Sequence, residues 1–132
     1  MGFDVHELLA KQLPTDNPVA LMELIAESES YGDTVAQELK KNEVSLAHYE
    51  AVLDREWQES MDANSKEKVA VAEARAKAAT ADTRQKVSEY TAEIKYLKKV
   101  GQIIENRCSV GQSFLSHSTA MIKASIGVPN VR

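Results

Sequence analysis

Apolar residues recur at alternating three- and four-residue steps through the second half of the chain. From residue 87 onward one stripe contains Tyr90, Ile94, Leu97, Ile104, Leu115 and Ile122, with the small residues Gly101, Cys108, Gly111 and Ser118 in its other positions. A second stripe beside it contains Val100, Ile103, Val110, Phe114 and Met121. Two adjacent apolar stripes make an apolar face that is wider than one neighbouring helix can cover. The pattern predicts one long helix, from about residue 84 to 126, and self-assembly to cover it.

The beginning of the chain predicts two shorter helices. Residues 3–13 have amphipathic spacing, and Pro14 ends that helix. A second helix is expected over residues 19–31. Its start is indicated by Asn17 as the capping residue and Pro18 at the first helical position, where the missing N–H of proline costs nothing.

A heptad-like helix is expected over residues 35–61, after a stop at Gly32. Its apolar stripe follows steps of four and three residues through Val35, Leu39, Asn42, Leu46, Tyr49 and Leu53. Asn42 within this stripe has two interpretations. A buried Asn would fix the register and the number of partners, whereas a half-exposed Asn at the helix edge would not.

An alanine-rich segment, residues 66–81, follows a bend at residues 62–65. Alanine, lysine and glutamate favour helix over strand, so this segment is expected to be a helix with a nearly bare surface. Polar residues at 80–83 could cap another helix, which leaves one or two helices open for residues 66–126. We therefore expect a single all-α domain, an elongated coiled-coil-like helical hairpin that assembles into a homo-oligomer such as a ring.

Charge divides this chain into two regions. Residues 1–64 contain 14 acidic and four basic side chains, a balance of −10, and residues 65–132 contain six acidic and 12 basic side chains, a balance of +6. Acidic and basic helices that pack together and neutralise each other would explain this. A basic region that binds an anion, above all nucleic acid, would also explain it.

Catalytic and metal-binding patterns are not found in the sequence. The three histidines are far apart, Cys108 lies on the apolar stripe, and no phosphate-binding glycine loop or HExxH motif occurs. We expect no enzyme activity, cofactor or metal. The single cysteine, together with the absence of a signal peptide and of a membrane-length apolar run, favours a cytoplasmic protein, in the host cytoplasm if a phage encodes it.

The basic residues around the alanine-rich segment are the candidate nucleic-acid contacts. Small side chains would let a phosphate backbone approach the helix, with cations on either side. The predicted contacts are Lys66, Lys68, Arg75, Lys77, Arg84 and Lys86. The alternative is a solvated helix face that pairs with acidic helices. The residues expected at the oligomer interface are Tyr90, Ile94, Leu97, Ile104, Arg107, Phe114 and Leu115.

The order of these features resembles the phage UvsY family of recombination mediator proteins. An acidic region leads into a heptad-like helix with an aromatic-containing end at residues 49–57, and a KVA…AR element follows at residues 68–75. The segment from Tyr96 to Leu115, apolar around Arg107, resembles the family's oligomerisation helix. Glu73 stands where the family tends to have further cations.

The resemblance implies a non-enzymatic function. Such a protein binds single-stranded DNA and promotes loading of a RecA-like recombinase on DNA coated by single-stranded-DNA-binding protein. An alternative from another class is a helical assembly factor, such as a phage scaffold or a prefoldin-like chaperone, that binds no nucleic acid. DNA binding in moderate salt distinguishes the two.

Overall fold

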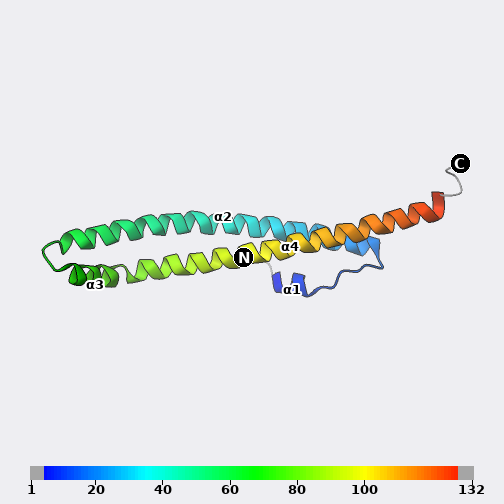
Figure 1. Cartoon of the computed structure of the whole chain (residues 1–132). Helices are drawn as coiled ribbons and strands as arrows, with labels where there is room; N and C mark the ends of the chain where they lie inside the picture. The colour runs from blue at the N-terminus through cyan, green and yellow to red at the C-terminus, as the bar shows by residue number, and fades with distance from the viewer. Residues whose placement is uncertain (1–4, 128–132) are drawn as a thin grey trace. The chain divides into compact units, whose positions relative to one another are not determined.

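The structure, a computed structural model, describes the backbone of residues 5–127 and the side chains of residues 7–121. Four helices make up this part of the chain: α1 (Val5–Ala10), α2 (Pro18–Ala63), α3 (Val69–Ala79) and α4 (Ala81–Gly127) (Figure 1). No strand occurs within residues 5–127, which confirms the all-α prediction. The chain divides into unit 1, Met1–Ala36 with Lys99–Arg132, and unit 2, Gln37–Lys98. Each unit thus combines a piece of the acidic half with a piece of the basic half.

Helix α2 begins where the sequence predicted but does not stop at Gly32. The Asn17 side chain accepts a hydrogen bond from the Ala20 N–H at 3.2 Å, and Pro18 is the first helical residue. The predicted end at Gly32 is wrong, because α2 continues without a break to Ala63. A methyl group on Gly32 would lie 3.5 Å from Ile104 Cγ2. This glycine therefore faces α4 at close range and does not turn the chain.

In unit 1, α2 and α4 pack antiparallel. Val35 faces Gly101, and Ile25 faces Gly111, so residue numbers rise along one helix as they fall along the other. The apolar core between them contains Leu21, Leu24, Ile25, Val35, Val100 and Ile104. Small residues on α4 bring the two backbones close together, and this is tightest at Gly111, where an added Cβ would lie 2.9 Å from two Ile25 atoms.

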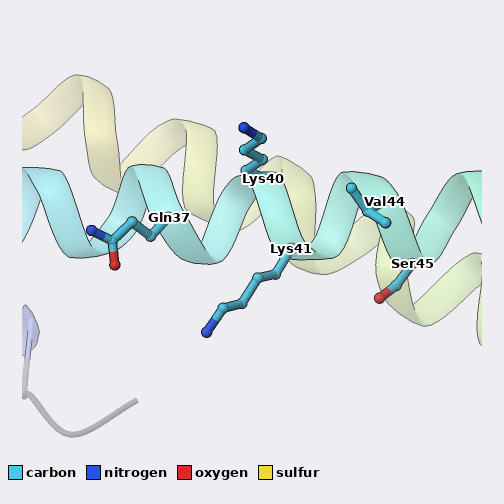
Figure 2. Close-up of a pocket in the computed structure, with 5 residues that line it drawn as sticks. All are labelled: Gln37, Lys40, Lys41, Val44 and Ser45. Atoms are coloured by element: carbon cyan, nitrogen blue, oxygen red, sulfur yellow. The ribbon is translucent and has the colours of Figure 1, made fainter.

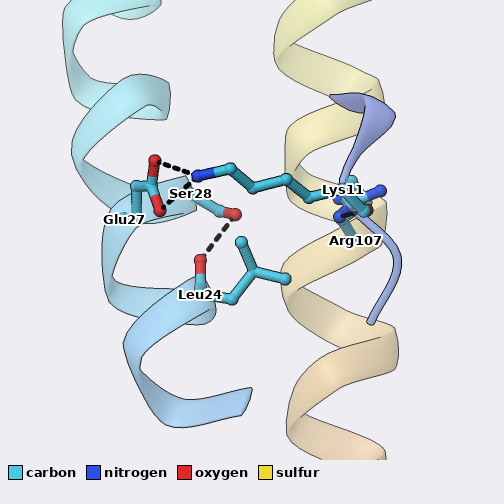
Figure 3. A network of polar contacts seen from close by, with 5 residues as sticks. All are labelled: Lys11, Leu24, Glu27, Ser28 and Arg107. Atoms are coloured by element: carbon cyan, nitrogen blue, oxygen red, sulfur yellow. Dashed lines mark hydrogen bonds and ion pairs between the residues drawn. The ribbon is translucent and has the colours of Figure 1, made fainter. Parts of the chain in front are cut away.

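Helix α1 is held in unit 1 by contacts at its carboxyl end. The Leu8 side chain is 1% exposed. The Arg107 guanidinium on α4 donates hydrogen bonds to the carbonyls of Leu9, at 3.2 Å, and Lys11. Lys11 reaches to Glu27 on α2, with an Nζ–Oε1 distance of 3.1 Å (Figure 3). Arginine thus satisfies carbonyls at the helix end that have no intrahelical partner.

Unit 2 is built by α3 and the adjoining parts of α2 and α4. Tyr49 stacks on Tyr90 with ring centroids 5.5 Å apart, and Thr83 donates a hydrogen bond to Glu56. The expected stripe on α2 is at least half-buried throughout. Asn42 follows the half-exposed interpretation, because its amide donates to the Glu38 carbonyl of the preceding turn at 2.7 Å.

The remaining helix boundaries lie at the turn between α2 and α3 and at the junction between α3 and α4. Helix α2 ends at Ala63, inside the predicted bend. Thr80 alone separates α3 from α4, and it is fully buried with its hydroxyl donating to the Ala76 carbonyl at 2.8 Å. Backbone bonds from Thr80 to Ala76 and from Arg84 to Thr80 continue across this residue. Two helices therefore cover residues 69–127, with a one-residue interruption.

Candidate nucleic-acid interface

The outer face of α3 is a smooth strip of alanine bordered by cations. Ala72 and Ala76 are buried on the inner face of α3. Ala70, Ala74 and Ala78, spaced four residues apart, are exposed on its outer face. Side chains three and four residues apart are neighbours on a helix surface. Lys77, three residues after Ala74, and Arg75, three residues before Ala78, therefore border the strip on its two edges.

Four of the six predicted contact residues are available cations. Lys66, Lys68, Lys77 and Lys86 are exposed, and within residues 7–121 none of them forms an ion pair. They all belong to unit 2. Lysine ammonium groups that are free of carboxylate partners can bind phosphate oxygens without first breaking an internal contact.

The other two predicted contact residues have structural partners. Arg75 donates to Asn64 Oδ1 at 2.8 Å and lies 3.4 Å from Glu67 Oε1, so it ties the turn after α2 to α3. Arg84 donates to the Thr80 hydroxyl at 3.3 Å and to the Lys77 carbonyl, where it caps α3. Sequence reasoning placed both arginines on the surface but did not find these partners, because Asn64 lies outside α3 and the Thr80 junction is not visible as a pattern.

Two tyrosines lie near Lys95, Lys98 and Lys99, and they differ in exposure. Tyr90 is half-buried against Tyr49, as expected for a residue on the inner stripe. Tyr96 is 40% exposed, and its neighbours Lys95 and Lys98 are exposed too. Of the two tyrosines, only Tyr96 presents a ring on which a base could stack.

Ion pairs do not connect the acidic half to the basic half among residues 7–121. The four pairs are Lys11–Glu27, Lys41–Glu38, Arg55–Glu59 and Arg75–Glu67, and each joins two residues of the same half. Within residues 7–121 the helices therefore pack side by side without ion pairs between the two halves. This distribution leaves most cations of the second half open to an external anion.

The expected oligomer-interface residues occupy different positions. Ile94, Leu97 and Ile104 are buried inside the chain, and Tyr90 and Leu115 are half-buried. Arg107 donates to the carbonyls of Leu9 in α1 and of Lys11 just after it, and its Nε atom is buried without a partner in the described residues. Phe114 is exposed, and it lies on the second stripe with Ile103, Val110 and Met121. Their exposure could not be read from the sequence, which shows two stripes without saying which one the chain covers itself.

The described side chains also bear on whether the chain holds a metal site, a reactive thiol or a binding pocket. No group of His, Cys, Asp or Glu residues within residues 7–121 could hold a metal ion. Burial raises the pKa of the half-buried Cys108 thiol, Glu29 raises it further, and Arg107 opposes both. This thiol is thus less ionised than a free one.

A shallow hollow on α2 is lined by Gln37, Lys40, Lys41, Val44 and Ser45 (Figure 2).

Comparison with known proteins gives no relative. No protein-family model matches the sequence, and neither curated proteins nor solved structures give a match. Among the helices within residues 5–127, none is long and apolar enough to cross a membrane.

Proposed function

We propose that this chain is a non-enzymatic protein that binds single-stranded DNA through α3 and the start of α4. The observation that carries the proposal is the strip of exposed alanines beside four exposed lysines that form no ion pair within residues 7–121. Lys66, Lys68, Lys77 and Lys86 would contact phosphates, while Arg75 and Arg84 hold the turn and the helix end that position them. The alanine methyl groups would let the strand lie close to the helix.

Contacts of this kind recognise the sugar–phosphate backbone and not the base sequence. No side chain on the strip is a hydrogen-bonding amide or a bidentate arginine free to read base edges. Affinity should therefore depend strongly on salt and little on sequence. The exposed Tyr96 would add a stacking surface that accepts any base.

Self-assembly would turn weak contacts into useful affinity. Four lysines per chain bind a strand weakly, but copies joined in a homo-oligomer present several such surfaces at a high effective concentration. By its resemblance to recombination mediators, we propose that the assembled protein remodels DNA coated by single-stranded-DNA-binding protein and so promotes loading of a RecA-like recombinase. These two proteins are the partners that this role requires.

A double substitution tests the DNA surface. Lys68→Ala with Lys77→Ala should weaken binding of a labelled oligothymidylate, measured by fluorescence anisotropy over a range of salt. The slope of log affinity against log salt is about −0.7 per neutralised phosphate, so two lost contacts should make it shallower by about 1.4. These lysines have no structural partner in the described residues, so helicity should be unchanged.

Lys40→Ala with Lys41→Ala is the matched control. These lysines are exposed on α2, and Figure 2 shows them projecting from it in different directions. Both double variants change the net charge equally, so a similar loss in both would show a diffuse charge effect and no site on α3. Glu73→Lys should act in the opposite direction and tighten binding. If the unmodified protein fails to bind the oligothymidylate even at low salt, the DNA-binding proposal is wrong.

The second candidate function is a helical assembly factor without nucleic acid. The exposed apolar residues on α4 favour it, since such a stripe indicates association with another helix. Under that function Lys66, Lys68, Lys77 and Lys86 would be an ordinary solvated surface, and the unmodified protein would form oligomers but not bind the oligothymidylate.

A further inference from the structure

A stripe of large apolar side chains on α4 is left uncovered in unit 1. Ile103, Val110, Phe114 and Met121 are 37%, 47%, 40% and 59% exposed. They lie beside the seam that packs on α2 and occupy none of it. Large exposed apolar patches are uncommon on soluble proteins unless another surface covers them.

The spacing of these four residues is that of a coiled-coil seam. Ile103 and Val110 are seven residues apart, as are Phe114 and Met121, and the two pairs are joined by a step of four. In a heptad repeat Ile103 and Val110 hold d positions, and Phe114 and Met121 hold a positions. Arg107 and His117 take the a and d positions between the members of each pair. Residues at a and d positions pack against those of another helix. The occupant that the spacing fits is therefore a helix with a matching heptad.

Charge is nearly absent from this part of α4. Between Val100 and Met121 only Glu105 and Arg107 are charged, and the residues that flank the stripe include Gln102, Asn106, Ser109, Ser113 and Ser116. Charged residues are depleted from the centres of protein interfaces, and flanks without charge do not repel a copy of themselves. The stripe is thus complementary to itself.

The last turns of α4 extend beyond the start of α2, as Figure 1 shows. A helix segment of a few turns is marginal in water unless its apolar face is packed. A hollow lined by Val110, Ser113, Phe114 and His117 lies on the part of α4 that precedes these turns, where a side chain of another helix could insert.

We propose that two copies of the chain pair through this stripe with their α4 helices antiparallel. In the register that brings a positions onto d positions, Ile103 faces Met121 of the second copy, and Val110 faces Phe114 of the second copy. A parallel pair would bring Arg107 beside Arg107 of the second copy, and like charges within a seam repel. The antiparallel pair instead places His117 of the second copy opposite Arg107.

This inference rests on the self-assembly in the proposed function and does not depend on DNA binding. It also differs from assembly through the inner stripe, because Ile94, Leu97 and Ile104 stay within their own chain. A dimer of this kind could be a building block of a larger oligomer and would carry two DNA surfaces.

Disulfide formation between single cysteines distinguishes the two directions of pairing. In a Cys108→Ser background, Ile103→Cys and Met121→Cys proteins of different mass are oxidised separately and as a mixture without DNA. The antiparallel pair predicts a crosslinked heterodimer in the mixture and little crosslinking of either protein alone. In that pair the two copies of position 103 are separated by roughly 27 Å, 18 residues at 1.5 Å each, which is beyond disulfide reach. Efficient crosslinking of Ile103→Cys alone would overturn the antiparallel arrangement.

Native mass tests whether the stripe is the interface. Val110→Asp should weaken dimerisation more than about tenfold by light scattering. Val19→Asp places the same charge on an exposed valine of α2 and should leave the mass unchanged. Circular dichroism of both variants verifies that they remain helical. An unmodified protein that is monomeric at tens of micromolar, or a folded Val110→Asp protein that keeps its mass, would exclude this interface. DNA binding by such a protein would leave the proposed DNA surface intact.

Discussion

Single glycines in this protein have opposite roles that depend on the distance to the facing helix. A methyl group at Gly111 would lie 2.9 Å from Ile25 Cγ1 and Cδ1, whereas one at Gly32 would lie 3.5 Å from Ile104 Cγ2. The first distance requires the Ile25 side chain to move, and the second is an ordinary contact. The sequence shows two glycines in helical segments and does not distinguish them.

Alanine substitutions should therefore shift stability in opposite directions. Gly32→Ala should stabilise the protein by about 0.5–1 kcal/mol, because glycine inside a helix is unfavourable by that amount and the new methyl group fits. Gly111→Ala should destabilise it by about 1–3 kcal/mol through overpacking. Urea unfolding followed by circular dichroism measures both. A Gly111→Ala protein as stable as Gly32→Ala would mean that the Ile25 side chain makes room for the methyl group at no cost.

At the scale of elements, α1 depends on its contacts more than on its own sequence. Six residues are too few for a stable isolated helix in water. Leu8 and the Arg107 hydrogen bonds to the Leu9 and Lys11 carbonyls therefore hold it in place. The Lys11–Glu27 pair contributes less, since both side chains are well exposed and such pairs are worth about 0–1 kcal/mol.

Arg107→Ala should release α1 while α2 and α4 remain paired. We expect faster amide exchange of residues 8–10 by mass spectrometry and little change on the α2 core residues. Lys11→Ala serves as the control and should leave exchange in α1 nearly unchanged. Equal protection of α1 in all three proteins would show that Leu8 alone is sufficient to hold it.

Most element boundaries could be predicted because they depend on local chemistry. Asn17 with Pro18 starts α2, and the polar residues before Lys66 end it, as the sequence indicated. The stop expected at Gly32 failed because a packing contact decided the outcome and local propensity did not. The same limit applies to the candidate site. Sequence spacing identified the lysines in and around α3, but the structural partners of Arg75 and Arg84 depend on how the chain folds.

At the scale of the whole molecule, the charge halves of the sequence and the structural units do not coincide. Unit 1 takes residues from both ends of the chain, and unit 2 takes its middle. Each unit therefore includes an acidic segment from the first half of the chain and a basic segment from the second half. Hydrophobic stripes reveal which faces are apolar, whereas charge along the sequence does not reveal which segments meet.

The pairing of α2 with α4 has a consequence for the order of folding. Contacts in unit 2 join residues close in sequence, such as Glu56 with Thr83, whereas unit 1 joins Ile25 with Gly111 and Leu9 with Arg107. Closing a longer loop loses more chain entropy, so contacts between nearby residues form earlier. Unit 2 should thus form in the folding transition state, and unit 1 should close afterwards. Destabilising substitutions in unit 2, such as Leu53→Ala, should mainly slow folding, while Val35→Ala in unit 1 should mainly speed unfolding in stopped-flow experiments. The two segments of unit 1 would then meet last and separate first.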